Sequence, residues 1–171
     1  MSMDKLWAPW RIDYVQGKKN KGCIFCAAAG SKPAGRGHAR HVVFRTPYSM
    51  CILNIFPYNN GHVMVAPLSH VRDLSRLCDE EVLDLMRSVE RTRKLLIAAL
   101  KPEGFNIGVN MGRVSGAGIP GHLHVHIVPR WNGDTNFMPI VGNTKVISQS
   151  LEQLHKLLRH ADTKTDAGYG K

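Results

Sequence analysis

Three histidines alternate with apolar residues in the run HLHVHIV at positions 122–128. Successive side chains of a strand point to opposite faces of a sheet, so this pattern predicts a strand that presents all three imidazoles on one face. In a regular strand the imidazoles would repeat about every 6.7 Å. Because zinc–nitrogen bonds are only about 2.0–2.1 Å long, one metal ion would not readily bind all three, and the row suits an extended polyanion better. Burying three imidazoles without partners is costly, so the pattern indicates a functional site.

The chemistry that these residues would support is nucleophilic attack on phosphorus. A neutral imidazole is a good nucleophile near neutral pH, and the phosphoramidate that it forms is reactive enough to turn over. A protonated neighbouring imidazole would stabilise charge on the leaving phosphate and supply its proton. The histidine row therefore predicts nucleotidyl transfer in two steps through a covalent nucleotidyl-histidine.

A loop with four glycines, GRVSGAGIPG at 112–121, leads into the predicted histidine strand. Glycine lets a phosphate approach the backbone closely, and consecutive backbone N–H groups form anion-binding concavities. A merely flexible loop is the alternative interpretation. Beside three histidines, the loop is interpreted as a phosphate-binding segment whose candidate contacts are Gly116, Ala117 and Gly118.

Cys23 and Cys26 form a C-x-x-C motif, which is typical of a zinc site or a redox pair and can also be coincidence. A redox pair would follow a strand, and the preceding segment QGKKNKG is not one. Structural zinc needs four ligands, and His70, which follows a predicted strand, is one candidate for the other two. The alternative is a pair of free cysteines and a surface histidine. Cys51 and Cys78 are expected to be small core residues.

Length and composition indicate one globular domain. The chain has 171 residues, of which 43% are hydrophobic and 21% charged, and its formal net charge is +10. No apolar run reaches the roughly 18 residues of a membrane-spanning helix, and the N-terminus lacks a signal-peptide pattern, so we expect a cytosolic protein. The positive charge favours an anionic partner, although it would also serve solubility alone.

Hydrophobic periodicity predicts the elements that position these residues. Short β-prone runs predict strands, an acidic start and a later proline delimit one long helix at 79–100, and leucines predict a second helix at 148–159. This order predicts an α+β domain with a mainly antiparallel sheet. We divide the chain into an N-terminal arm at 1–21, a single domain at 22–160 and a disordered tail at 161–171. The predicted strands are 42–45, 50–56, 62–67, 105–111 and 122–129, with a hairpin turn at 57–61.

The histidine run resembles the signature of the histidine-triad (HIT) family, in which three histidines alternate with apolar residues. The similarity extends over about residues 22–130: Asn54 stands eight residues before His62, and Asn110 precedes the glycine loop, as in that family. The segments LWAPWR near the N-terminus and PRWNGDTNF at 129–137 are most similar to the bacterial branch of diadenosine polyphosphate phosphorylases and hydrolases.

The resemblance implies a five-stranded sheet with one long helix and a C-terminal helix. It implies an ATP adenylyltransferase-like phosphorylase or hydrolase that cleaves dinucleoside polyphosphates or related adenine nucleotides, without an organic cofactor. By this resemblance His124 is the nucleophile, His122 orients it, and His126 lies near the leaving phosphate oxygen. His62 supports the triad, Asn54 contacts the ribose, and Asn110 is a further substrate-binding residue.

Two further expectations come from the resemblance. Zinc-bearing relatives use residues at the positions of Cys23, Cys26, His70 and His122, which implies a structural zinc at one end of the histidine strand. The family usually forms homodimers through the long helix and a sheet edge. One departure is at Gly118, where many members carry Ser or Gln as a phosphate ligand, so phosphate contact there would come from backbone N–H groups or water.

Two other function classes fit parts of the sequence. A nucleic-acid-binding module would use the positive charge, but the chain has no aromatic–basic interleaving, RNA-recognition signature or basic helix, so nucleic acid is not the expected partner. A zinc-dependent hydrolase would hold a catalytic metal on the histidine strand. The sequence leaves the acceptor open among water, phosphate and another metabolite, and it leaves the preferred base and phosphate-chain length open.

Overall fold

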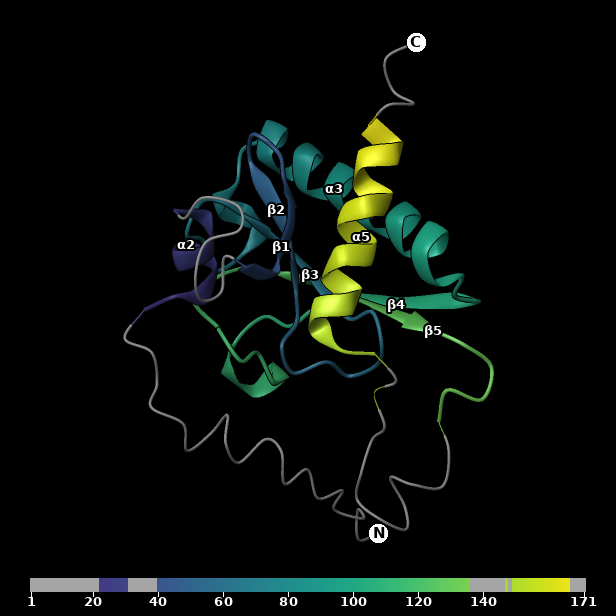
Figure 1. Ribbon diagram of the computed structural model, residues 1–171. Coiled ribbons are helices and arrows are strands. Elements are labelled where there is room, and N and C mark those ends of the chain that lie inside the picture. Colours follow the sequence, from purple (N-terminus) through teal and green to yellow (C-terminus); the bar gives the residue numbers. More distant parts are fainter. Residues whose placement is uncertain (1–21, 31–39, 136–146, 148, 167–171) are drawn as a thin grey trace, which may run out of the picture.

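The computed structural model describes residues 22–30, 40–135, 147 and 149–166 (Figure 1). The predicted N-terminal arm at 1–21 lies outside these residues. Among the helices in these ranges, none has the length and apolar character needed to cross a membrane.

Five strands form one sheet, and every neighbouring pair is antiparallel. The spatial order β1-β2-β3-β5-β4 makes β1 and β4 the two edges and places β5 between β3 and β4. This confirms the predicted α+β class and the five-stranded antiparallel sheet. The strands are β1 (Val42–Arg45), β2 (Ser49–Leu53), β3 (Val63–Pro67), β4 (Gly104–Val109) and β5 (Val125–Arg130).

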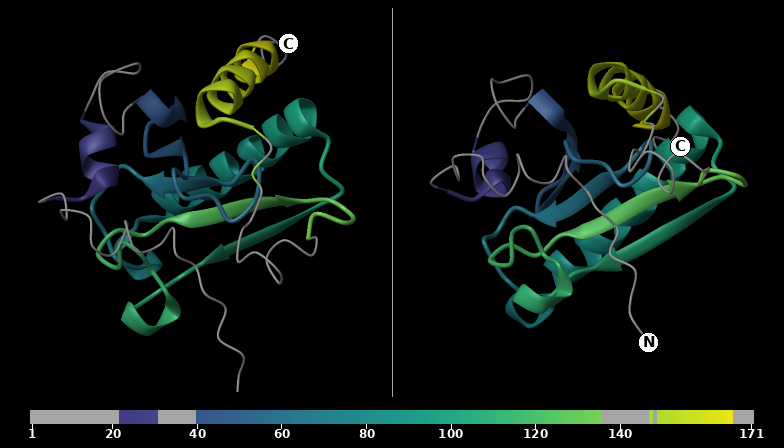
Figure 2. Two further views of the ribbon diagram at one scale, coloured as in Figure 1. Left: turned by 60° about the horizontal axis from the view of Figure 1, so that its bottom comes forward. Right: turned by 90° about the horizontal axis from the view of Figure 1, so that it is seen from below.

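Two long helices cover one face of the sheet, and one short helix packs on the other. Helix α3 (Asp79–Leu100) and helix α5 (Leu151–Asp166) share one apolar cluster with alternate residues of the strands, and they cross each other in Figure 1. The short helix α2 (Ile24–Ala29) packs on the opposite face, where it buries Phe25 and Ala28. Figure 2 shows α2 at the end of the sheet where β5 begins. His126 pairs in register with Met64, whose side chain belongs to the α2 cluster, so His126 lies on the α2 face.

Helix α3 begins and ends at the residues that the sequence predicts. The Glu81 carboxylate accepts a hydrogen bond from the Cys78 backbone N–H at 3.1 Å, which closes a capping box at the start. Lys101 ends the helix in the left-handed conformation, with φ +49°, just before Pro102. The prediction that Cys78 lies in the core is wrong, because the capping position places it at the surface; Cys51 is buried as expected.

Helix α5 extends past the predicted end at 159, so the predicted tail starts too early. Asp162, assigned to the tail, is buried, and its Oδ1 accepts hydrogen bonds from Nε and Nη2 of Arg91 at 3.0 and 2.7 Å. This bridge to α3 gives the last turns of α5 a tertiary partner, which the local sequence does not reveal. The remainder of the predicted tail, 167–171, lies outside the described residues.

Candidate active site and metal centre

The histidine run enters the sheet later than predicted. Strand β5 begins at Val125, because its pairing with β3 and with β4 starts there, opposite Val65 and Val109. The backbone N–H groups of His122 and Leu123 instead donate to loop carbonyls, those of Ile119 at 3.3 Å and Val71 at 2.6 Å. The prediction that all three histidines project from one regular strand is therefore wrong for the first two. The ring centroids of His124 and His126 lie 4.8 Å apart, closer than the repeat of about 6.7 Å expected for alternate residues of a regular strand.

His124 is held as one neutral tautomer. Its Nδ1–H donates to the backbone carbonyl of His122 at 2.8 Å, and the residue is only 4% exposed. Burial lowers the pKa of His124, although the bond to the carbonyl partly opposes this shift. With the proton on Nδ1, the lone pair is on Nε2, which is the form that a nucleophilic imidazole requires.

A chain of hydrogen bonds also defines the tautomers of His62 and His126. The backbone N–H of Tyr58 donates to Nδ1 of His62 at 3.0 Å, so the ring proton of His62 is on Nε2. Nε2 of His62 lies 2.9 Å from Nδ1 of His126, and its N–H donates to that nitrogen. Nδ1 of His126 is thus an acceptor, and the ring proton of neutral His126 is on Nε2.

Burial keeps His126 neutral by lowering its pKa to about 4, with a smaller contribution from nearby His124. The sequence interpretation assigned a protonated imidazole to this part of the site. The structure instead provides a neutral ring that offers an N–H donor. Its role on the leaving oxygen is accordingly hydrogen-bond stabilisation of charge.

The side-chain amide of Asn54 contacts His62, and a hydrogen bond to a neighbouring backbone group fixes the orientation of that amide. Its Oδ1 accepts the Phe56 backbone N–H at 2.9 Å, which directs Nδ2 toward the imidazole, 3.3 Å from Nδ1. The ribose contact expected of Asn54 remains a prediction. In this structure the side chain supports His62.

Cys23, Cys26, His70 and His122 come together at one end of the site. Their ligand atoms all lie within 4.8 Å of one another. Nδ1 of His122 is 3.2 Å from Sγ of Cys23 and 3.2 Å from Nδ1 of His70. Sγ of Cys26 is 3.1 Å from Nδ1 of His70.

These distances fit a tetrahedral metal ion. Bonds of about 2.3 Å to sulfur and 2.0–2.1 Å to nitrogen place the ligand atoms of a tetrahedron roughly 3.3–3.8 Å apart. The Nε2–H of His122 donates to the Pro67 carbonyl at 2.9 Å, which leaves Nδ1 with a lone pair toward the cluster. Two thiols and two imidazoles are the donor set that zinc prefers. The four residues predicted from the sequence therefore form a site that could hold zinc.

Phe25, inside the C-x-x-C motif, connects this cluster with the histidine row. The side chain is fully buried, and its ring centroid lies 5.0 Å from that of His122 and 4.9 Å from that of His124. Sequence reasoning missed this residue. The available signal was an aromatic residue between two predicted ligands, but only the tertiary structure places it against His124.

The glycine loop turns just before the site. It contains a short helical turn, η3 (Arg113–Ser115), flanked by Gly112 and Gly116 with φ of +85° and +81°. Glycine is favoured at both positions because other residues rarely adopt a positive φ. Ile119, farther along, packs against the α2 cluster. The phosphate contacts expected of Gly116, Ala117 and Gly118, and the role of Asn110, remain predictions.

Comparison with known proteins agrees with this geometry. The HIT domain profile matches residues 36–133. The chain is 36% identical over 161 residues to AP-4-A phosphorylase of Mycobacterium tuberculosis (strain CDC 1551 / Oshkosh), covering 91% of this chain and 83% of that protein. It is 36% identical over 93 residues to the asymmetrical bis(5'-nucleosyl)-tetraphosphatase of Schizosaccharomyces pombe, covering 54% and 50% respectively.

A solved structure shows the same fold. The zinc-bound histidine triad family protein of Mycobacterium smegmatis superposes with a TM-score of 0.65 at 28% identity, covering 85% of this chain and 96% of that chain. The profile match spans more than half of the chain and includes all three histidines of the row as well as His62. The chain therefore belongs to the HIT, or histidine-triad, family.

Proposed function

We propose that this protein cleaves dinucleoside polyphosphates, such as diadenosine tetraphosphate, by transferring a nucleotidyl group to His124. The observation that carries the proposal is the hydrogen bond from His124 Nδ1–H to the His122 carbonyl, which leaves a neutral Nε2 lone pair as the nucleophile. The similarity to a phosphorylase and to a tetraphosphatase that both act on such compounds supports this substrate class.

Each histidine has a distinct part in the proposed first step. Nε2 of His124 bonds to the α-phosphorus while the P–O bond to the leaving phosphate breaks, and that bond's electron pair stays on the leaving oxygen. The Nε2–H of His126 stabilises the charge on this oxygen, and His62 holds His126 in the donor tautomer. An acceptor then attacks the nucleotidyl-histidine and restores His124.

Inorganic phosphate is the acceptor that we propose. The similarity to the mycobacterial phosphorylase extends over most of both chains, whereas the similarity to the tetraphosphatase, a hydrolase, covers about half of each. Water is the second candidate. Both acceptors use the same intermediate, so one assay decides between them.

Cys23, Cys26, His70 and His122 would hold a structural zinc, as the distances between their ligand atoms and the zinc-bound relative support. A zinc ion bound there would tie α2 to the segment that precedes β5 and would balance the negative charge of the two cysteines, which bind as thiolates. No step of the proposed reaction uses it.

We also propose that the protein forms a homodimer through α3 and the β4 edge. Apolar side chains on these elements are exposed, and β4 has a free side for pairing in the described part of the chain. Exposed apolar groups of this kind favour an interface. The exposed apolar side chains are Leu83 and Met86 on the first half of α3, Ile97 on its second half, and Ile107 on β4.

The test of the function is incubation with diadenosine tetraphosphate, with and without phosphate, followed by separation of the products. ADP plus ATP formed only with phosphate would identify a phosphorylase, and AMP plus ATP formed without it would identify a hydrolase. Absence of turnover under both conditions, with tight and salt-dependent binding of polynucleotide, would overturn the proposal and favour the nucleic-acid-binding alternative.

A further inference from the structure

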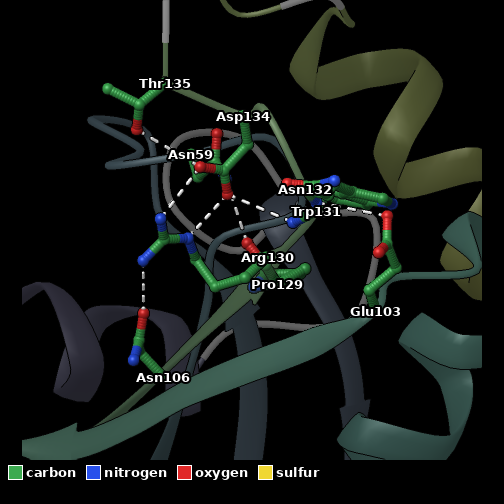
Figure 3. Close-up of polar contacts among 9 residues, drawn as sticks. All are labelled: Asn59, Glu103, Asn106, Pro129, Arg130, Trp131, Asn132, Asp134 and Thr135. Carbon is green, nitrogen blue, oxygen red and sulfur yellow. Dashed lines mark hydrogen bonds and ion pairs between the residues drawn. The ribbon is translucent and has the colours of Figure 1, made fainter.

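A buried carboxylate organises the segment that follows β5. Oδ2 of Asp134 accepts hydrogen bonds from Nε of Arg130 at 2.6 Å, from the Trp131 backbone N–H at 3.2 Å and from Nδ2 of Asn59 at 2.9 Å. Its Oδ1 accepts from Nη2 of Arg130 at 2.9 Å and from the Thr135 hydroxyl at 3.3 Å. Figure 3 shows these groups converging on the carboxylate. The Asp134 side chain is 8% exposed, and these contacts hold the pKa of its carboxyl well below the usual range.

Asn59 connects this cluster with the turn between β2 and β3. Its Nδ2 donates both to Asp134 and to the Pro129 carbonyl, the latter at 3.0 Å, and the residue is 6% exposed. Its backbone carbonyl accepts the N–H of His62 at 3.2 Å. One buried side chain therefore attaches the turn to the end of β5, while its backbone holds the histidine.

The turn is also confined from the other side. Gly61 has a φ of +75°, and a Cβ at this position would meet Leu100 Cδ1 at 2.6 Å and Pro129 Cγ at 2.9 Å. A turn packed this closely has little freedom to shift. The position of Tyr58, next to Asn59, is thus set by the packing around Gly61 and by the Asn59 side chain.

The position of the Tyr58 backbone N–H determines the tautomers of two histidines. That N–H donates to Nδ1 of His62, and the Tyr58 ring lies 4.6 Å from the His62 ring and 5.7 Å from the His126 ring. Nδ2 of Asn54 lies 3.3 Å from Nδ1 and 3.4 Å from Nε2 of His62, so this amide does not favour one ring nitrogen over the other. If the turn moved away, Nδ1 of His62 would lose the Tyr58 donor, which is the contact that distinguishes the two nitrogens, and could carry the ring proton itself. Nδ1 of His126 would then lose its donor, and the proton of His126 would no longer be restricted to Nε2.

We infer that Asn59 and Asp134 are positioning residues for the nucleotidyl transfer: they hold the 57–61 turn where Tyr58 fixes His62, and through it His126, as hydrogen-bond donors. This inference rests on the proposed function. Neither residue needs to touch the substrate. The two residues contribute to the rate through the stabilisation of charge on the leaving oxygen. The loss of rate on substituting either residue should therefore be larger for leaving groups that bear more negative charge.

Two isosteric substitutions test the inference. Asn59→Asp cannot donate to Asp134 or to the Pro129 carbonyl, and Asp134→Asn places an amide nitrogen against donors. The control is Asn106→Ala, because Nη1 of Arg130 donates to Asn106 Oδ1 at 2.8 Å on a side of the cluster that does not involve Asn59. All variants retain the nucleophile and the metal ligands.

The first readout compares two AMP esters that differ only in the leaving group. Phenol has a pKa of about 10, so phenoxide needs much stabilisation, whereas p-nitrophenoxide is a far weaker base. We expect Asn59→Asp and Asp134→Asn to reduce kcat on the phenyl ester about 10- to 100-fold, and on the p-nitrophenyl ester less than about threefold. KM should change little, and Asn106→Ala should keep the wild-type ratio. Because the ratio is taken within one variant, partial unfolding does not alter it.

The second readout is the tautomer state, measured by long-range ¹H–¹⁵N NMR of protein labelled at histidine. The wild type should show the proton of His62 and of His126 on Nε2. Asn59→Asp should shift both rings toward a mixture, and Asn106→Ala should not. Unchanged tautomers in a folded Asn59→Asp variant, or equal losses on the two esters, would overturn the inference. Turnover of neither ester by the wild type, with intact tautomers, would instead count against the proposed function.

Discussion

The ring of Phe25 lies 4.9 Å from the ring of His124, although 98 residues of chain separate the two positions. The same ring lies 5.0 Å from His122, a candidate zinc ligand. Phe25 is therefore a direct packing link between the metal centre and the proposed nucleophile.

Phe25→Leu should lower kcat by more than the accompanying loss of unfolding free energy would explain. A displacement of about 1 Å at a reacting group can cost about 100-fold in rate, so we expect a loss of about 10- to 100-fold. Ile52→Val is the control, since Ile52 is buried in the same cluster. It should cost about 0.5–1.5 kcal/mol of unfolding free energy and little activity. Equal losses of kcat in the two variants, measured well below both Tm values, would contradict the link.

His124→Ala should remove turnover, with a loss of about 1,000-fold or more, because no other group forms the covalent intermediate. Fold and nucleotide binding should persist. His155→Ala is the matched control, because Nε2 of His155 donates to the Val42 carbonyl in the α5–β1 contact. Acid-labile nucleotidyl-protein should be trapped on the wild type and on His155→Ala but not on His124→Ala. Trapping on any other residue would refute the assignment.

Metal removal should lower stability. At zinc about 1,000-fold above its Kd, binding contributes about 4 kcal/mol, which corresponds to roughly 8–16 °C in Tm for a chain of this size. Cys26→Ser should lose zinc by elemental analysis and show this lower Tm. Exposed Cys78 provides the control, and Cys78→Ser should retain one zinc per chain. Equal zinc content in both variants would exclude the proposed ligand set.

His126 should make the protein less stable in acid. Its pKa is about 4 in the folded chain and near 6.5 when unfolded, so the unfolded state binds more protons between these values. Stability should therefore be fully present above pH 6.5 and fall as the pH drops toward 4. His126→Gln, which cannot titrate, should show a shallower fall in Tm over this range. The comparison is made with chelator present, so that metal loss is common to both proteins. Parallel curves would show that His126 is not buried as a neutral ring.

Met86→Lys should separate the proposed dimer. Met86 is 56% exposed on α3, and a charge there would be desolvated in the interface. Tyr48, 44% exposed in the turn between β1 and β2, lies at the opposite edge of the sheet, so Tyr48→Lys is the control. Light scattering at micromolar concentration should give a dimer for the wild type and for Tyr48→Lys, and a monomer for Met86→Lys. A monomeric wild type would contradict the dimer itself.

The sequence by itself determined the fold class, the extent of α3 and the residues that gather in the site. The fold elements depend on local regularities: a 3.6-residue apolar period with acidic and proline boundaries for α3, and alternation for the strands. For the metal ligands, the C-x-x-C spacing pointed to Cys23 and Cys26, and the resemblance to zinc-bearing relatives completed the set with His70 and His122. Asp79–Leu100 was predicted to the residue, and Cys23, Cys26, His70 and His122 are brought together as predicted.

Only the tertiary structure decided where the histidine strand begins, how far α5 extends and which tautomers the imidazoles adopt. The start of β5 depends on where its neighbours β3 and β4 stop pairing, and the last turns of α5 depend on Arg91 of another helix. The proton of His126 depends on a backbone N–H of Tyr58, relayed by His62. These features come from contacts between residues distant in sequence, and a single hydrogen bond or buried ring leaves no periodic pattern along the chain.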